Sequence, residues 1–331
     1  MVTGTASFLV IGARLQIQLP QSEISRVKRF VFPQIFRKIG FSARAVLSEV
    51  HNMPELPEVE TMVRGIRPHC ENRRIESIEF PPCDRKPISI FPDRNSIKQL
   101  AGHTLQRVGR LGKRVILELD NLSVLVVEPR MTGLLLVTAP PTRDHLRVVW
   151  RFDPTSRPEL ASQMMFWDRR GLGTLSLLSP AEFAALRQRL GPDALDITPA
   201  EWPSRLAHSR RPIKVALLDQ TVAAGIGNLY ASEILHHAGI SPKRSACNLS
   251  PQRIKRLHEA VQHVLHEAIR FEGSTLNDGT YRNALNQDGS FQNHHRVYDR
   301  EGEVCPSCGQ SQIRRIVQAQ RSTFYCPHCQ K

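Results

Sequence analysis

The chain has 331 residues, and its 45 Lys and Arg outnumber its 31 Asp and Glu, which gives a formal net charge of +14. A length of about two domains and 40% apolar residues exclude a wholly disordered chain. No run approaches the ~18 uncharged apolar residues that a membrane span needs, and the positive charge indicates a polyanionic partner such as nucleic acid.

Residues 1–52 are expected to form an extension outside the packed domains. They carry seven Lys or Arg against two acids, and their one helical pattern, Ile24 to Val31, is interrupted by Pro33. A start codon assigned too early explains such a segment most simply, and a removable, transit-like segment is the alternative.

The next part of the chain, 53–183, is predicted to be an antiparallel β-sandwich with flanking helices. Pro57 suits the first turn of a helix in which Val59, Val63 and Ile66 recur at helical spacing. β-Rich runs follow without intervening helices, which favours antiparallel strands over a parallel sheet. These runs cover 115–119, 122–127, 134–138 and 146–152.

The second half of the chain is predicted to be helical and to end in a compact cysteine module, which makes the whole an α+β multidomain protein. A linker is expected over 184–200, a helical domain over 201–290 and the module over 297–331. Helices are expected near Ile213 to Leu218, from Asn228 onward, and from Ser250 and Pro251 onward.

Four of the seven cysteines form two close pairs near the end of the chain, Cys305 with Cys308 and Cys326 with Cys329. Two such pairs can place four thiolates around zinc, and four protein ligands leave no open position, so one structural Zn²⁺ is predicted. The odd cysteine total argues against a secreted disulfide framework, and we expect a reducing, intracellular compartment.

A glycine turn, Gly225 to Asn228, leads into one of the expected helices, and Asn228 is predicted to be its N-cap. The exposed N–H groups of a helix N-terminus bind anions, although most such turns are purely structural. The strong positive charge favours phosphate binding here. Arg314, Arg315 and Arg321, between the cysteine pairs, would let a small hairpin contact phosphates as well, although taken alone a solvated basic hairpin explains them equally well.

Several separated motifs resemble those of the formamidopyrimidine-DNA glycosylase family. They stand in the family's order, and the resemblance covers essentially all of 53–331. The opening Pro-Glu-Leu-Pro-Glu-Val resembles the oxidised-purine branch more than the oxidised-pyrimidine branch. The motifs are Met53 to Thr61, Gly109 to Lys113, Glu128 to Gly133, Gly225 to Glu233, and Ala319 to Tyr325 with the last two cysteines.

The resemblance implies an N-terminal antiparallel β-sandwich, a helix-two-turn-helix domain and a C-terminal zinc finger, with duplex DNA held between the lobes. Members excise oxidised purines, such as 8-oxoguanine and formamidopyrimidines, and cut the strand by β,δ-elimination in base excision repair. By the same resemblance, the amine of Pro54 attacks C1′ to form an iminium, Glu55 donates and accepts protons, and Glu58 organises the site.

The resemblance also assigns contacts to DNA. Lys113 is assigned to the catalytic group with Pro54 and Glu55, as the lysine that reaches the lesion and its phosphate. Asn228 and Arg321 correspond to the phosphate clamps, and Met131 to the residue that fills the gap left by base flipping. Lys214 is a weaker candidate for a phosphate contact. Without the resemblance, Lys113 would be a solvated lysine and Met131 a core residue.

The sequence departs from the family at its nucleophile. Fifty-three residues precede Pro54, and the nitrogen of an internal proline is a planar amide whose lone pair is delocalised. Such a nitrogen cannot attack a sugar carbon. We therefore expect the active species to begin at Pro54, through translation from Met53 or through processing.

Two further departures concern base recognition. Where the family usually has Asp-x-Arg-Arg-Phe-Gly, residues 168–173 place Gly171 at the arginine that reads the orphaned cytosine and Leu172 at the wedging phenylalanine. Arg170 is the candidate replacement, and we expect weaker discrimination among opposing bases. Residues 277–296, where the family carries its lesion-capping loop, lack the usual Gly-Tyr-Phe, which leaves the choice among lesions open.

The leading hypothesis is a bifunctional DNA glycosylase and abasic-site lyase for oxidised purines. We expect it to act as a monomer on double-stranded DNA, without a membrane partner, in a bacterial cytoplasm where DNA binding associates it with the nucleoid. A non-catalytic protein that binds lesion or abasic DNA and an oxidised-pyrimidine glycosylase remain as alternatives.

Overall fold

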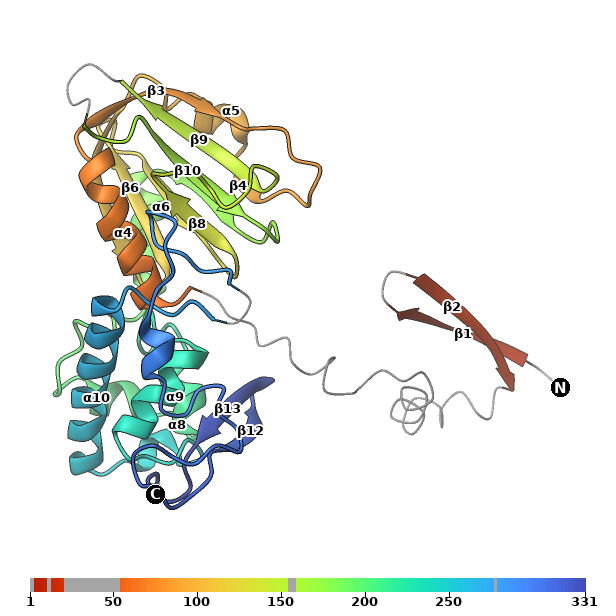
Figure 1. Ribbon diagram of the computed structural model, residues 1–331, viewed down its shortest axis with the longest axis vertical. Helices are drawn as coiled ribbons and strands as arrows, with labels where there is room; N and C mark the ends of the chain where they lie inside the picture. Colours follow the sequence, from red (N-terminus) through yellow and green to blue (C-terminus); the bar gives the residue numbers. More distant parts are fainter. Residues whose placement is uncertain (1–2, 11–12, 21–53, 154–158, 277–278) are drawn as a thin grey trace. The chain divides into compact units, whose positions relative to one another are not determined.

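The computed structural model describes residues 3–10, 13–20, 54–153, 159–276 and 279–331 (Figure 1). It divides into two compact units, 1–51 and 52–331. In the first, β1 (Thr3–Val10) and β2 (Ala13–Pro20) pair antiparallel, with Thr3 opposite Pro20. The helical pattern from Ile24 to Val31 lies outside the described residues.

The second unit begins with a β-sandwich. Its strands follow the order β4-β11-β7-β6-β5-β3-β9-β10-β8, and only the β4–β11 pair is parallel. The strands are β3 (Arg73–Glu79), β4 (Ser89–Phe91), β5 (Thr104–Leu111), β6 (Arg114–Leu119), β7 (Val124–Glu128), β8 (Gly133–Leu136), β9 (Leu146–Phe152), β10 (Gln163–Asp168) and β11 (Thr174–Leu178).

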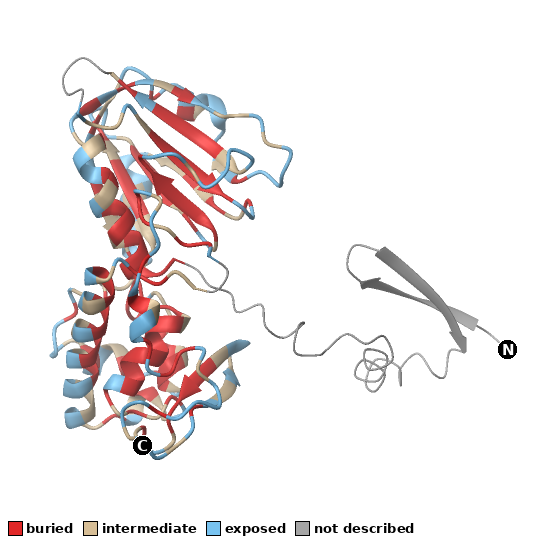
Figure 2. Cartoon of the chain, in the orientation of Figure 1, coloured by how far each residue is buried: buried red, intermediate tan, exposed pale blue. Residues whose placement is uncertain are grey.

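Strand β3 joins the two halves of the sheet, because it pairs with β5 at Arg73 and with β9 from Ile75 onward. Leu117 of β6 and Trp150 of β9 line the same small internal cavity, so the two halves face each other across one core. Figure 2 shows the buried residues concentrated along these strands. The predicted sandwich is confirmed, and the four predicted strand runs correspond to β6, β7, β8 and β9.

Helices cover the sandwich and tie it to the rest of the unit. Helix α4 (Leu56–Cys70) packs on β5, β6 and β8 and also contacts α10. The short α5 (Arg94–Lys98) is capped by Asp93. Helix α6 (Pro180–Gln188) packs on β11. The predicted linker therefore starts inside a helix, because residues 184–188 belong to α6.

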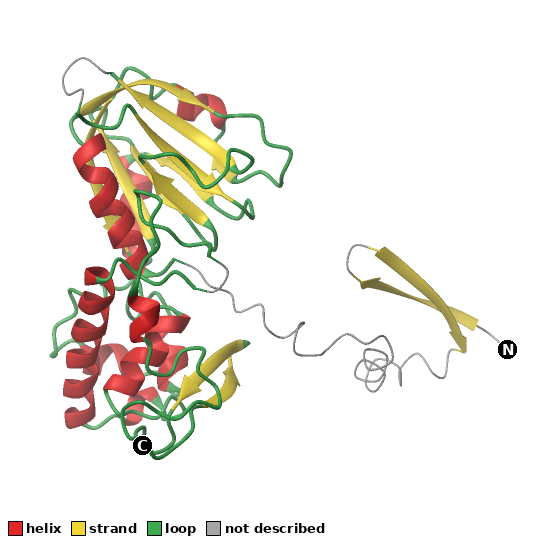
Figure 3. Ribbon diagram, viewed as in Figure 1, coloured by secondary structure: helices red, strands yellow, loops and turns green. Residues whose placement is uncertain are grey.

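The second lobe is helical (Figure 3). It contains α7 (Trp202–Leu206), α8 (Ile213–Leu217), α9 (Asn228–His237), η1 (Ala246–Asn248), α10 (Pro251–Arg270) and η2 (Phe291–His294). The hydroxyl of Ser250 caps α10, as predicted. A hairpin of β12 (Arg314–Gln318) and β13 (Arg321–Tyr325) completes the unit. None of the helices in the described residues has the length and apolar composition needed to cross a bilayer.

A buried ion network fastens the sandwich to the start of the helical lobe. Arg110 of β5 donates to Glu60 of α4 at 2.9 Å and to Asp193 at 3.1 Å. The exposed fraction is 10% for the Arg110 side chain, 16% for Glu60 and 14% for Asp193. These charges are shielded from water, and each depends on the others for compensation.

We predict that Arg110→Ala lowers the free energy of unfolding by about 3 kcal/mol, because it removes the largely buried cation that Asp193 and Glu60 share. Arg64→Ala is the matched control, since Arg64 contacts the same Glu60 but its side chain is 58% exposed. Its cost should be below about 1 kcal/mol. Urea denaturation of both variants measures the difference, and equal losses would contradict the account.

Candidate active site

The N-termini of two helices meet at the centre of the site. Glu55 precedes α4, and its carboxylate accepts the backbone N–H of Leu229 at 2.9 Å and that of Tyr230 at 3.4 Å. These are N–H groups of the first turn of α9, which have no partner inside the helix. Glu55 is 5% exposed, and the positive end of the helix dipole compensates its buried charge.

This contact corrects one prediction from the sequence. Asn228 is not the N-cap of α9, because Gly227 occupies that position and makes no side-chain cap. The cap comes instead from Glu55, a residue far away in the sequence.

The two glycines of the turn make this approach possible. Gly225 has φ +107°, and a Cβ there would lie 2.5 Å from Leu56 Cδ1. A Cβ on Gly227 would lie 2.2 Å from Glu55 Cδ. Any larger residue at either position would push the Glu55 segment away from α9.

Glu58 holds the backbone at the start of α4. Its carboxylate accepts the N–H of Glu55 and the N–H of Ser274, both at 2.9 Å, and the hydroxyl of Tyr230. Burial raises the pKa of Glu58 to about 7; these donors favour the ionised form, but burial outweighs them and the charge of Glu55 adds to the rise. The buried Pro54 is the residue next to Glu55.

Lys113 lies beside these acids. It belongs to the two-residue turn between β5 and β6, and a Cβ on the preceding Gly112 would lie 3.3 Å from Ala224 Cβ. The turn therefore lies against the start of the Gly225 segment. Burial lowers the pKa of the half-buried Lys113, the negative charge of Glu55 opposes this, and Arg321 adds to it.

Lys214 does not lie where a phosphate contact requires it. It is fully buried, and its ammonium donates to Asn228 Oδ1 at 2.7 Å, to the Ser322 carbonyl at 3.0 Å and to Thr323 Oγ1 at 3.0 Å. All three of its donors are thus occupied. We therefore withdraw Lys214 as a phosphate contact: it joins the partly exposed Asn228 to strand β13, where Arg321 is exposed.

Met131, Arg170 and Leu172 form a second group, held by Asp168. The buried Asp168 carboxylate accepts the hydroxyl of Thr132, which is next to Met131, and the backbone N–H of Gly173 at 2.8 Å. The N–H of Arg170 donates to Thr132 Oγ1 at 2.9 Å. The Met131 turn and the 168–173 loop are therefore fixed side by side, with Arg170 exposed and Met131 and Leu172 half-buried.

Gly171 is required by this loop. Its φ is +61°, and a Cβ there would lie 2.0 Å from the Lys86 carbonyl oxygen. An arginine at this position would force the backbone to move. The backbone that this chain adopts at residue 171 therefore requires glycine.

The four cysteines of the terminal module form a metal site. Cys305, Cys308, Cys326 and Cys329 place their sulfur atoms within 4.8 Å of one another. The Cys305–Cys329 and Cys308–Cys326 pairs are 3.9 and 3.7 Å apart. Four thiolates at the corners of a tetrahedron around zinc are about 3.8 Å apart. The cluster fits one structural zinc ion.

Two important residues received no role in the sequence analysis. The carboxylate of Glu233 accepts the N–H groups of Arg296, Val297 and Tyr298 at 2.7 to 3.0 Å, and so fixes the chain that enters the zinc module. Asp168 was noted only as part of a motif. A buried acid whose partners are backbone N–H groups leaves no periodic signal in a sequence, so only the motifs could have pointed to them.

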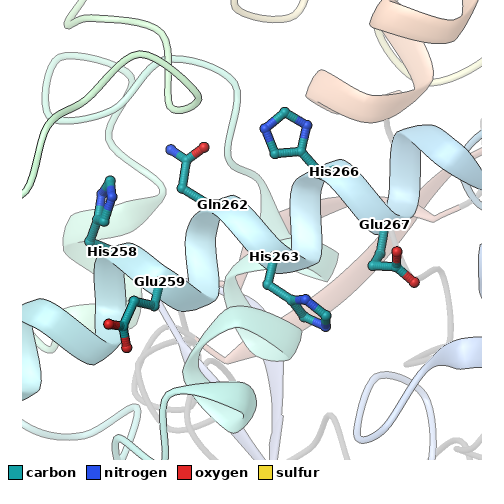
Figure 4. Close-up of a pocket in the computed structure, with 6 residues that line it drawn as sticks. All are labelled: His258, Glu259, Gln262, His263, His266 and Glu267. Carbon is teal, nitrogen blue, oxygen red and sulfur yellow. The ribbon is translucent and has the colours of Figure 1, made fainter.

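An open pocket on α10 lies apart from these groups. Its lining residues are His258, Glu259, Gln262, His263, His266 and Glu267. Figure 4 shows His258, Gln262 and His266 on one side of the helix and the other three on the opposite side, so the six side chains do not converge on one point. None of the predicted site residues lines it.

Comparison with known proteins identifies the family. Residues 53–175 match the formamidopyrimidine-DNA glycosylase N-terminal domain, 190–280 the H2TH domain of the same family, and 302–331 the zinc finger found in FPG and IleRS. A formamidopyrimidine-DNA glycosylase of Chloroflexus aurantiacus is 41% identical over 283 residues, which cover 84% of this chain and 98% of the relative. The chain belongs to the formamidopyrimidine-DNA glycosylase family.

Solved structures of the family share the fold. The MutM (FPG) protein of Thermus thermophilus is 34% identical with a TM-score of 0.71, and covers 84% of this chain and 98% of its own. A Lactococcus lactis FPG mutant in complex with Fapy-dG containing DNA is 32% identical with a TM-score of 0.73, and covers 84% of this chain and 100% of its own. The α+β architecture with an H2TH domain and a zinc finger, predicted from the sequence, is confirmed.

The raised pKa of Glu58 predicts a pH dependence of stability. An unfolded glutamate has its ordinary pKa near 4.5, so the folded state binds this proton more tightly, with a pKa of about 7. The tighter binding of this proton stabilises the folded protein. This contribution is complete below the unfolded pKa of Glu58 and is lost as the pH rises through its folded pKa. Between pH ~4.5 and ~7, wild-type stability should therefore decline relative to Glu58→Gln, by up to about 3 kcal/mol. Parallel pH profiles of urea unfolding for the two proteins would contradict this.

Removal of zinc should unfold the terminal module selectively, because metal binding and folding are coupled in such sites. With a chelator, we expect proteolysis to begin within 297–331 while the sandwich stays intact, and DNA affinity to fall because Arg321 is no longer held. Limited proteolysis read by mass spectrometry and a DNA-binding titration measure both. Unchanged DNA affinity after loss of the module would show that the hairpin makes no contact with DNA.

Proposed function

We propose that this chain excises oxidised purines from duplex DNA and cuts the strand at the resulting abasic site, with the amine of Pro54 as the nucleophile. As a member of its family it is a DNA glycosylase of base excision repair. The substrate class is supported by relatives solved with Fapy-dG containing DNA and with carbocyclic 8-oxo-G containing DNA.

The observation that carries the proposal is the position of Pro54 beside Glu55, whose carboxylate is held on the N-terminus of α9. The Pro54 amine forms a bond to C1′ of the damaged nucleotide and loses its proton while the bond from C1′ to the base breaks, and the base leaves protonated. The bond from C1′ to O4′ then breaks with a proton delivered to O4′, which opens the sugar and leaves an iminium at C1′. Glu55 is the nearby group that exchanges this proton. Loss of a proton from C2′ converts the iminium to an enamine, whose electron pair expels the 3′ phosphate from C3′. Loss of a proton from C4′ then expels the 5′ phosphate from C5′.

The mechanism requires a free secondary amine. In the 331-residue chain the nitrogen of Pro54 is an amide, whose lone pair is delocalised. The active form therefore begins at Pro54. If it does not, the same surfaces would make the chain a protein that binds lesion DNA without cleaving it.

The proposed DNA contacts form two groups. Asn228, which Lys214 joins to Ser322, and the neighbouring Arg321 would bind phosphates beside the flipped nucleotide, with Lys113 near the lesion. Met131, Arg170 and Leu172 would fill the gap and face the opposite strand. With Gly171 fixed in its backbone turn, Arg170 is the cation left to contact the orphaned base, so we propose weak discrimination among opposing bases.

Three further properties belong to the proposal: the preferred lesion, the oligomeric state and the place of the enzyme in the cell. Residues 288–292 depart from the family pattern, which is the observation that keeps an oxidised-pyrimidine glycosylase as the second candidate. We further propose that the protein acts as a monomer and that DNA binding associates it with the nucleoid.

Borohydride trapping tests the proposal. Protein beginning at Pro54 should become covalently attached to an 8-oxoguanine duplex when the iminium is reduced, and the intact 331-residue chain should not. Glu55→Gln in the shorter protein should reduce base excision by about 100-fold or more, because one proton transfer is lost. A duplex with an oxidised pyrimidine separates the second candidate. Trapping by neither protein, with binding retained, would support the non-catalytic alternative.

A further inference from the structure

The segment between α10 and η2 docks on the sandwich. We call residues 279–290 the strap; Figure 1 shows this part of the chain running from the end of α10 to the sandwich and back. Tyr281 and Ala284 are 6% and 1% exposed, and both belong to the hydrophobic core of the sandwich. A Cβ on Gly65 of α4 would lie 2.5 Å from Ala284 Cβ, so this glycine leaves room for the strap.

Backbone contacts hold the strap against the end of β8. The N–H of Val137 donates to the Ala284 carbonyl at 3.0 Å, and the side-chain amide of Asn286 donates to the Ala139 carbonyl at 3.0 Å. The strap is therefore a packed part of the N-terminal lobe, although the chain that forms it follows the helical domain.

A further hydrogen bond joins the strap to the 168–173 loop. The Nη2 atom of Arg169 donates to Thr280 Oγ1 at 2.8 Å, and Thr280 is 5% exposed. The backbone of the loop is held on both sides of Arg169. The Asp168 carboxylate accepts the Thr132 hydroxyl and the N–H of Gly173, and the N–H of Arg170 donates to Thr132 Oγ1. The hydrogen bond from the Arg169 guanidinium thus ties the strap to a part of the loop whose backbone is held in place.

The other side of the strap touches the catalytic end of α4. The hydroxyl of Tyr281 donates to the backbone carbonyls of Glu272 at 3.0 Å and Glu58 at 3.3 Å. At the base of the strap, the N–H of Ser274 donates to the Glu58 carboxylate, which in turn accepts the N–H of Glu55. A continuous set of contacts therefore leads from Arg169 through the strap to Glu55.

We propose that Arg169 is a positioning residue that fixes the strap through Thr280 and so couples the loop facing the opposite strand to the site of base excision. This inference rests on the proposed function. Arg169 itself touches neither the nucleophile nor Glu55; it acts through Thr280 and Tyr281. Base excision needs the damaged base held in place, whereas cleavage of a preformed abasic site has no base to hold, so the two steps should respond differently.

Four single variants isolate the contact. Thr280→Val removes the hydroxyl at constant shape, and Thr280→Ser keeps it. Arg169→Ala removes the donors, and Arg169→Lys keeps a charged donor group. In the form of the chain that trapping shows to be active, Arg169→Ala and Thr280→Val should lower kcat for base excision by about 10-fold and change KM by less than about 2-fold. Cleavage of a preformed abasic duplex should change by less than about 2-fold. Thr280→Ser should restore most of the loss, and Arg169→Lys part of it.

Two readouts decide the outcome. The double variant Arg169→Ala/Thr280→Val should be no slower than Thr280→Val alone, because Thr280→Val already removes the contact with Arg169. A multiplicative loss would overturn the proposal. Hydrogen exchange of the full 331-residue chain gives a readout independent of activity: amides of 279–290 should exchange about 10-fold faster in Arg169→Ala. Unchanged exchange would overturn the coupling even if the wild-type protein were never trapped on DNA, and failure of trapping alone would count against the proposed function only.

Discussion

The site depends on the carboxylate of Glu55 bound to the first turn of α9. A buried carboxylate is costly unless its charge is compensated, and the unpaired N–H groups of a helix N-terminus contribute to that compensation. This single contact accounts for Gly225 and Gly227, which leave room for the approaching chain. It also restricts the position of Pro54, which is adjacent in the sequence and buried.

Elsewhere in the unit, single buried charges hold the backbone of the segments proposed to contact DNA. Asp168 fixes the 168–173 loop, Lys214 joins Asn228 to β13, and Glu233 fixes the entry to the zinc module. In each case the buried group hydrogen-bonds to other groups of the protein. It therefore positions neighbouring surface residues and does not itself contact DNA. The exposed residues beside them, such as Arg170 and Arg321, are the ones left to contact DNA.

The sequence predicted the parts of the fold that have a strong local signal. Strands β6 to β9 are rich in apolar residues and were predicted, whereas β3, β4, β5, β10 and β11 were not. Strand β5, Thr104–Leu111, mixes arginines and glycine with its apolar residues, but β10, Gln163–Asp168, was missed although it is largely apolar. The zinc ligands followed from spacing alone. Asn228 was wrongly predicted to be the N-cap, and Lys214 to be a surface contact, because their true environments are made by residues distant in the sequence. Periodicity and motif spacing carry no information about such long-range partners.

The most direct test of the account identifies the nitrogen that reacts. Protein beginning at Pro54 is reduced with borohydride on an 8-oxoguanine duplex, the adduct is digested, and the modified peptide is sequenced by mass spectrometry. The account predicts one modification, on the α-amine of Pro54. Attachment at Lys113 instead, or an adduct formed equally well by the intact 331-residue chain, would contradict it.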